Sequence, residues 1–145
     1  MSHEWRTNLK YDPVPQLLDS GDPALDYFTR RDLLDQLPGD IEDIWDTSRV
    51  QRIITHQNQD GSWDYSGQRN ESRIRENYKL LQTYRNLGIL VESYGMDRTQ
   101  AGGSKAADYL FAHQTTEGDI RGIFGSQYVP HYTAGMLELL IKAGY

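Results

Sequence analysis

The chain has 145 residues, a formal net charge of −6 and no cysteine. The negative balance argues against nucleic acids and anionic membrane surfaces as partners, because phosphate binding needs clustered lysine and arginine. Without cysteine there are no disulfides, thiol nucleophiles or cysteine zinc sites, which agrees with a cytoplasmic location. The sequence contains no apolar stretch long enough for a membrane span, and its first residues lack a signal core.

The first third of the chain is predicted to hold short helices. Residues 1–11 show no periodicity and are expected to form a tail, whereas residues 12–47 form N-terminal helices. Asp22 suits an N-cap, because its carboxylate accepts free backbone N–H groups, and Pro23 suits the first helical position. The apolar residues that follow have helical spacing, which predicts that this helix continues to Pro38.

Residues 48–95 and 96–145 are each predicted to form a pair of helices around a polar loop. In the first pair, Gly88 suits the position after a helix C-terminus. In the second pair, Asp97 suits the N-cap of a capping box and Pro130 starts the last helix. Strand signals are nearly absent, so the chain is predicted to be all-α.

Two segments within these helix pairs read alike. Residues 56–63 read His-Gln-Asn-Gln-Asp-Gly-Ser-Trp, and residues 113–120 read His-Gln-Thr-Thr-Glu-Gly-Asp-Ile. The second segment lies 57 positions after the first, since 113 − 56 = 57. Self-similarity at a fixed period indicates stacked helical hairpins.

The first segment resembles the QW-type motif of the squalene/terpene cyclase and protein prenyltransferase repeat superfamily. The matching residues are Gln57, Asp60, Gly61 and Trp63, with Gln114, Glu117 and Gly118 in a degraded second copy. In that family the glutamine caps a helix end, and the turn packs its indole against the next helix. These residue types suit the role, because glycine permits positive φ, aspartate accepts local N–H groups and tryptophan buries a large surface.

The resemblance implies a single domain of α/α helical-hairpin repeats, a partial α/α toroid. The N-terminal segment, residues 12–29, also resembles the leader of uncharacterised prokaryotic squalene-cyclase-like proteins. In a stacked array another helix should cover the last pair. We therefore expect residues 1–145 to be a fragment of a longer toroid, with self-association as the alternative.

The chemistry of the family is matched only weakly. Class II cyclases protonate an alkene with an Asp-x-Asp-Asp motif, and the nearest match is Asp40, Glu42 and Asp43. A buried carboxylic acid could act as a general acid, but acidic residues are also favoured at a helix start, which is the preferred interpretation. Prenyltransferases bind zinc through aspartate, cysteine and histidine. Because cysteine is missing, we predict no metal site and no cofactor, and the catalytic residues stay unknown.

Five side chains are candidates for ligand contact: Tyr78, Tyr84, Tyr128, His131 and Tyr132. Aromatic residues in the family's toroids stabilise carbocations or pack isoprenoid tails. The alternative is that these rings fill the core between helices. Two functions stay open. One is a cyclase-like or prenyltransferase-like repeat domain that handles an isoprenoid or other apolar small molecule without a complete catalytic site. The other is a non-enzymatic helical-repeat module that binds a protein or peptide.

Overall fold

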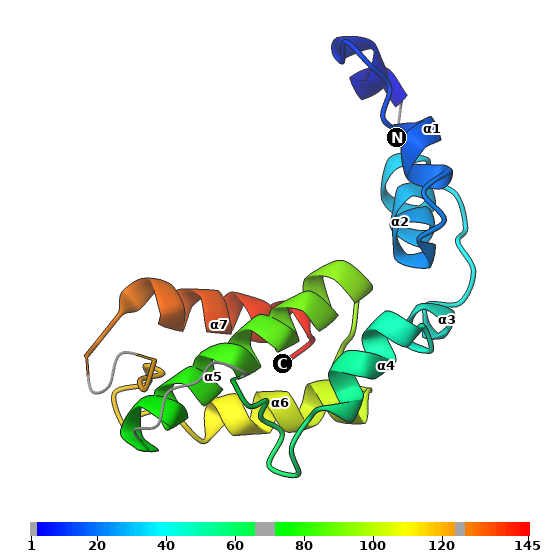
Figure 1. Cartoon of the computed structure of the whole chain (residues 1–145). Coiled ribbons are helices and arrows are strands. Elements are labelled where there is room, and N and C mark those ends of the chain that lie inside the picture. Colours follow the sequence, from blue (N-terminus) through cyan, green and yellow to red (C-terminus); the bar gives the residue numbers. More distant parts are fainter. Residues whose placement is uncertain (1–2, 66–71, 124–126) are drawn as a thin grey trace. The chain divides into compact units, whose positions relative to one another are not determined.

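The computed structural model describes residues 3–65, 72–123 and 127–145. Over these residues the chain is all-α, as predicted (Figure 1). Its β-type pairing there is an isolated antiparallel bridge between Gln114 and Ile120. The chain divides into two compact units, Met1–Thr47 and Ser48–Tyr145. The second unit starts at the residue where the first helix pair was predicted to start.

Unit 1 is built from short helices around few buried side chains. They are the 3₁₀ helix η1 (His3–Asn8), α1 (Val14–Leu18), α2 (Pro23–Phe28), its π-helical continuation η2 (Thr29–Leu33) and α3 (Glu42–Trp45). Asp22 caps α2 as predicted, since its carboxylate accepts the N–H groups of Ala24 (3.0 Å) and Leu25 (3.4 Å).

Two predictions for unit 1 are wrong: the absence of a helix near the N-terminus and the end of the helix that begins at Pro23. Residues 3–8 are helical where a tail was expected. The helix that begins at Pro23 ends before Pro38, because Asp35 takes a left-handed φ of 54°. Leu37, which the apolar pattern placed in this helix, is 98% exposed. Leu37 therefore makes no buried apolar contact that would favour a longer helix.

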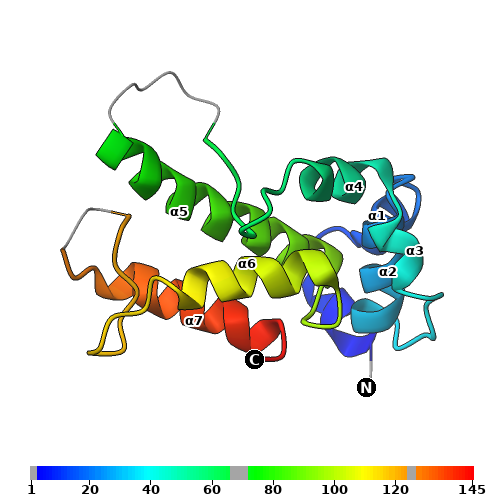
Figure 2. The same ribbon diagram turned by 90° about the horizontal axis from the view of Figure 1, so that it is seen from below.

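Unit 2 holds two helix pairs (Figures 1 and 2). The first pair is α4 (Ser48–Thr55) and α5 (Ser72–Gly88), which continues as the π-helical turn η3 (Ile89–Ser93). The second pair is α6 (Ala101–Phe111) and α7 (Pro130–Lys142). Helix α5 packs against both α6 and α7, and η3 packs against α7. The side chains at the centre of this core are Leu80, Leu87, Leu90, Ala106, Leu110 and Met136.

Helix α5 does not end at Gly88, as the sequence suggested. Gly88 has a helical φ of −56°, and the helix continues because Leu90 and Val91 are buried. It ends at Gly95 instead, where φ is 61° and the N–H donates to the Val91 carbonyl (3.1 Å). This left-handed glycine is the usual C-terminal stop of a helix.

The start of α6 also differs from the prediction. Gln100 is its N-cap residue, whereas the Asp97 carboxylate accepts the N–H of Thr99 (2.8 Å) in the turn before the helix. The last helix starts at Pro130, as predicted.

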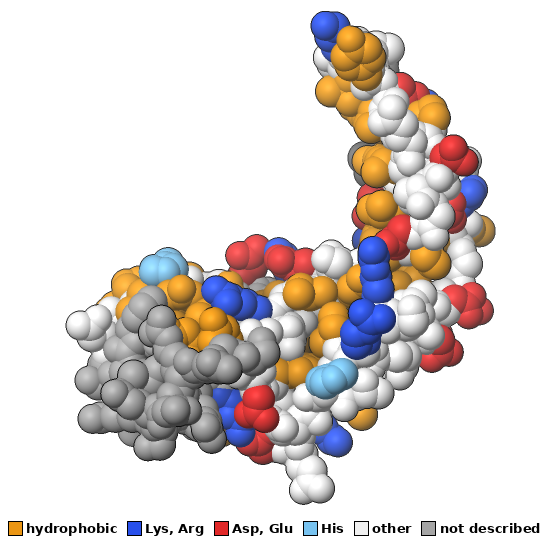
Figure 3. Space-filling view, in the orientation of Figure 1, with side chains coloured by type: hydrophobic (Ala, Val, Ile, Leu, Met, Phe, Trp, Pro, Cys, Tyr) orange, Lys and Arg blue, Asp and Glu red, His pale blue; other side chains and the backbone are white. Residues whose placement is uncertain are grey.

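The surfaces of both units mix charged and hydrophobic side chains. Figure 3 shows acidic and basic groups interspersed with hydrophobic ones on the visible face. Among the described helices, none combines the length and the apolar character needed to cross a lipid bilayer.

Candidate functional site

The first turn, residues 56–63, is closed by its own hydrogen bonds. The N–H of Asn58 donates to the Ser62 carbonyl (2.8 Å), and the N–H of Gly61 donates to the Asn58 carbonyl (3.0 Å). The side-chain amide of Gln57 donates to the Gly61 carbonyl (2.9 Å). Gly61 has a φ of 86°, a backbone conformation that glycine adopts without steric cost.

The second turn, residues 113–120, has the same pattern. The N–H of Thr115 donates to the Asp119 carbonyl (2.8 Å), and the N–H of Gly118 donates to the Thr115 carbonyl (3.0 Å). The Gln114 side chain donates to the Gly118 carbonyl (2.8 Å), and Gly118 has a φ of 90°. Each of these groups lies 57 positions after its counterpart in the first turn.

A buried apolar side chain follows each glycine. Trp63 is 2% exposed and Ile120 is 4% exposed. The N–H of Trp63 donates to the Thr83 hydroxyl (3.1 Å), and the N–H of Ile120 donates to the Thr133 hydroxyl (3.3 Å). The Trp63 indole also donates to the carbonyl of Ile53 (2.7 Å), a bond that isoleucine cannot make.

Thr83 and Thr133 are site residues that sequence reasoning missed. Both are buried and both lie on the helix that follows their turn. The available signal was a polar residue at core spacing, since Thr83 lies between Leu80 and Leu87 on the apolar face of α5.

The histidine at the start of each turn caps the preceding helix. Nδ1 of His56 donates to the Arg52 carbonyl (2.7 Å), and Nδ1 of His113 donates to the Tyr109 carbonyl (2.8 Å). Each histidine therefore satisfies a carbonyl in the last turn of the helix before it.

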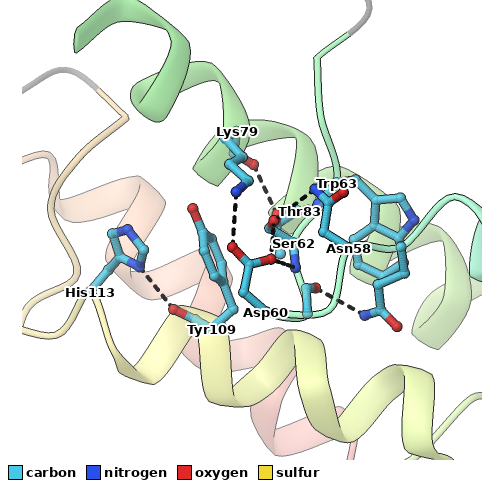
Figure 4. A network of polar contacts seen from close by, with 10 residues as sticks. Asn58, Asp60, Ser62, Trp63, Lys79, Thr83, Tyr109 and His113 are labelled. Atoms are coloured by element: carbon cyan, nitrogen blue, oxygen red, sulfur yellow. Dashed lines mark hydrogen bonds and ion pairs between the residues drawn. The ribbon is translucent and has the colours of Figure 1, made fainter. Parts of the chain in front are cut away.

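A polar network joins the first turn to α5 and α6 (Figure 4). The Asp60 carboxylate accepts the N–H (3.0 Å) and the hydroxyl (2.5 Å) of Ser62 and the ammonium of Lys79 (2.9 Å). Partial burial raises the pKa of Asp60, but these three donors together outweigh it and lower the pKa to about 2. The Lys79 ammonium also lies over the ring of Tyr109, 5.8 Å from its centroid. Asp60 is therefore a structural carboxylate, held ionised.

The first turn is docked on the start of α6. Gln57 donates a second hydrogen bond, to the carbonyl of Gly102 (2.9 Å). The backbone of Gly61 lies so close to α6 that a Cβ there would be 2.0 Å from the Lys105 carbonyl oxygen. A Cβ at Gly102 would lie 3.5 Å from Cγ1 of Ile54. Gly102 weakens the helix by about 1 kcal/mol relative to alanine, and it is buried next to Ile54 and Gln57.

The five candidate ligand residues fall into three places. The rings of Tyr84 and Tyr132 meet edge to face, with centroids 6.2 Å apart, and the His131 ring lies 4.3 Å from Tyr132. Tyr78 stacks on Tyr65, at 4.7 Å. The fifth candidate, Tyr128, is 59% exposed and follows the second turn.

Tyr84 lines a groove of about 390 Å³ between α5–η3 and α7. The apolar part of its lining consists of Tyr84, Gly88, Ile89, Gly135 and Leu139. Tyr84 approaches α7 so closely that a Cβ at Gly135 would lie 2.5 Å from its hydroxyl oxygen. Burial raises the pKa of Tyr84, and two nearby carboxylates add to this effect.

Those two carboxylates are paired at the rim of the groove. Lys142 forms ion pairs with Glu92 and with Glu138, each at 2.8 Å. Their hydrogen bonds hold the pKa of Lys142 above its ordinary value.

A second hollow, of about 520 Å³, lies beside the second turn. Its lining includes Glu117, Gly118, Asp119, Arg121, Tyr128 and Thr133. Arg121 pairs with Glu117 and with Asp119. The hydrogen bond from Arg121, followed by that from Thr115, lowers the pKa of Asp119.

The acidic group of unit 1 lacks the burial that an alkene-protonating acid needs. Asp40, Glu42 and Asp43 lie at the start of α3 and are all exposed. Within the described residues, no cluster of histidine and acidic side chains could hold a metal ion.

No family model, curated protein or solved structure matches the chain. The resemblance to the cyclase and prenyltransferase repeats therefore stays a prediction that rests on the residues of the two turns.

Proposed function

We propose that this chain is an α/α-repeat domain of the squalene-cyclase-like or prenyltransferase-like kind, part of a toroid of stacked hairpins. The observation that supports this most is the shared hydrogen-bond pattern of the two turns. Both turns have two backbone bonds, a glutamine–carbonyl bond, a left-handed glycine and a threonine-bound amide. The turn residues recur at a spacing of 57 positions, whereas the two threonines lie 50 positions apart, since 133 − 83 = 50. Two unrelated loops have no physical reason to share all of these features.

We further propose that the groove between α5–η3 and α7 binds an apolar small molecule, with an isoprenoid as the best example. Its volume of about 390 Å³ lies in the range of ligand sites, roughly 300–1,000 Å³. Tyr84, Ile89 and Leu139 give it an aromatic and aliphatic lining. Glu92 and Glu138 share the ammonium of Lys142 at the rim, which offsets one of their two negative charges, and the charge that remains does not repel an uncharged ligand.

The test is binding of farnesol, an uncharged isoprenoid alcohol, to the intact chain and to an Ile89→Asp variant. Ile89 lines the groove but is 42% exposed, so a carboxylate there should leave the melting temperature nearly unchanged. Leu137→Asp is the matched control, because Leu137 is 38% exposed on α7 and outside the groove lining.

We expect native mass spectrometry to show one farnesol bound per chain, with at least tenfold weaker binding to Ile89→Asp and unchanged binding to Leu137→Asp. The chain purified without added ligand should also retain an apolar adduct. Absence of saturable binding, or equal loss in both variants, would contradict the proposal.

The second candidate is a helical-repeat module that binds a protein or peptide. It is favoured by one specific observation: α6 lies against Gly61 of the first turn, whereas no atom of the described residues lies within 4 Å of a Cβ placed on Gly118. Native mass spectra without any adduct, together with farnesol binding too weak to saturate, would favour this function over the first.

A further inference from the structure

The hydroxyl of Tyr84 is an unused hydrogen-bonding group in the lining of the groove between α5–η3 and α7. Within the described part of the chain it takes part in no hydrogen bond. The ring meets that of Tyr132 edge to face, and its oxygen lies so close to α7 that a Cβ at Gly135 would be 2.5 Å away. These contacts give the hydroxyl a defined position in the groove.

A ligand that fills the groove takes water away from this hydroxyl. Tyr84 is half-buried, so the loss of water without a new partner weakens binding, whereas an oxygen of the ligand replaces the lost hydrogen bond. Burial, followed by the carboxylates of Glu92 and Glu138, raises the pKa of Tyr84, so the hydroxyl keeps its proton and can donate to such an oxygen. The second hydroxyl of the lining belongs to Ser93, an exposed residue at the end of η3.

The groove has polar groups at both ends and apolar groups between them. Tyr84 lies against Gly135 at one end, and Glu92 pairs with Lys142 at the other. Tyr84 and Glu92 are eight residues apart, since 92 − 84 = 8, which is about 12 Å along a helix. An apolar ligand with its oxygen at Tyr84 therefore extends along Ile89 toward the charged end.

The charged groups around the groove balance one another. Glu92, Glu138 and Arg85 line it, and Lys142 pairs with both carboxylates at the rim. Two negative and two positive charges leave no net charge. A charged head group would bring an unbalanced charge into a largely apolar lining, which is unfavourable.

We propose that Tyr84 determines the head group of the ligand, so that the groove selects an uncharged isoprenoid alcohol over the hydrocarbon and over the corresponding acid or amine. This inference rests on the proposed binding of an apolar molecule in the groove. Tyr84 acts as a specificity residue, because its hydroxyl bonds the oxygen of the ligand while Ile89 and Leu139 contact the apolar chain.

The test compares farnesol with the hydrocarbon that differs from it only by loss of the hydroxyl group. Both are titrated into the isotope-labelled intact chain, and the methyl NMR signals of Ile89 and Leu139 report binding. Tyr84→Phe removes the hydroxyl and keeps the ring. Tyr132→Phe is the matched control, because Tyr132 is half-buried in the same aromatic pair but lies outside the groove lining.

We expect the intact chain to bind farnesol about fivefold more tightly than the hydrocarbon, which corresponds to about 1 kcal/mol. In Tyr84→Phe the preference should disappear, because farnesol binds more weakly while the hydrocarbon binds as before. Tyr132→Phe should keep the preference. At pH 7, farnesoic acid and farnesylamine should both bind the intact chain more weakly than farnesol.

A second measurement needs no variant. In the intact chain labelled at the tyrosine Cζ carbon, farnesol should shift the Tyr84 signal, and the hydrocarbon should shift it less. Equal shifts at saturation would mean that the ligand oxygen does not reach the hydroxyl, and would overturn the inference.

Four other results decide the matter. Saturable farnesol binding with equal affinity for the hydrocarbon, or a preference retained in Tyr84→Phe, would overturn the inference and leave the proposed binding of an apolar molecule standing. Tighter binding of the acid or the amine than of farnesol would also overturn the inference alone. Absence of saturable binding for every compound would overturn both the inference and the proposed function.

Discussion

Alanine substitutions at the two left-handed glycines can separate two contributions to stability: the packing of the first turn against α6 and the strain of the backbone. Gly61 and Gly118 have φ values of 86° and 90°, so alanine at either position has a similar conformational cost, roughly 1–2 kcal/mol. At Gly61 the new methyl group would also lie 2.0 Å from the Lys105 carbonyl oxygen, whereas at Gly118 it meets nothing within 4 Å of the described residues. Because the obstacle is helix backbone, relief requires α6 to move, which adds about 1–3 kcal/mol as in overpacked cores.

We therefore expect Gly61→Ala to lower the free energy of unfolding by about 2–5 kcal/mol and Gly118→Ala by about 1–2 kcal/mol. Urea denaturation followed by circular dichroism measures both losses. In melting temperature, each kcal/mol corresponds to about 4–8 °C for a unit of this size. Equal losses in the two variants would refute the reasoning, because they would mean that the first turn is not held against α6.

Three further outcomes follow from the same contacts. Thr83→Val removes the acceptor of the buried Trp63 N–H and should cost about 1–3 kcal/mol in chemical denaturation; no loss would mean that this bond is absent. Asp60 has a pKa lowered from 3.8 to about 2, so its stabilisation is present above pH 4 and lost as the pH falls toward 2. Since that carboxylate is half-exposed, Asp60→Asn should remove less than about 1 kcal/mol of this acid dependence, and an unchanged acid profile would argue against the network. Gly135→Ala should displace the Tyr84 hydroxyl and bring the raised pKa of that tyrosine down, which NMR titration of labelled tyrosine tests; an unaltered titration would contradict the close approach.

The left-handed glycines of the turns were predictable, because positive φ depends on residue types within a few positions. The role of the glutamines differs from the one that the resemblance implied. Gln57 and Gln114 each donate to a carbonyl of their own turn, four residues later, instead of capping a helix end. The helix ends were less predictable, since tertiary burial decides them. Leu90 and Val91 are buried, so α5 passes through Gly88 and ends at Gly95.

The candidate ligand residues were only partly predictable. Tyr84, Tyr132 and His131 do gather, because α5 packs against α7. Tyr78 lies six residues before Tyr84, about 240° around a helix of 3.6 residues per turn, so the two rings leave α5 on different sides.

The role of the buried threonines could not be read from the sequence. Thr83 accepts from an amide 20 residues earlier in the chain, and Thr133 from one 13 residues earlier. These two separations differ because the connections between turn and helix differ in length. A sequence comparison in register, at 57 positions, therefore does not pair the two threonines.

Amide hydrogen exchange of the two turns tests the central claim, that they are structural repeats of one another, most directly. Three hydrogen-bonded amides occupy matching positions in the two turns: those of residues 58, 61 and 63 in the first, and of residues 115, 118 and 120 in the second. We predict that both sets exchange slowly, while the amides of Gln59 and Thr116 between them exchange fast. Protection of the first set alone, with residues 115, 118 and 120 exchanging as freely as Thr116, would contradict the repeat.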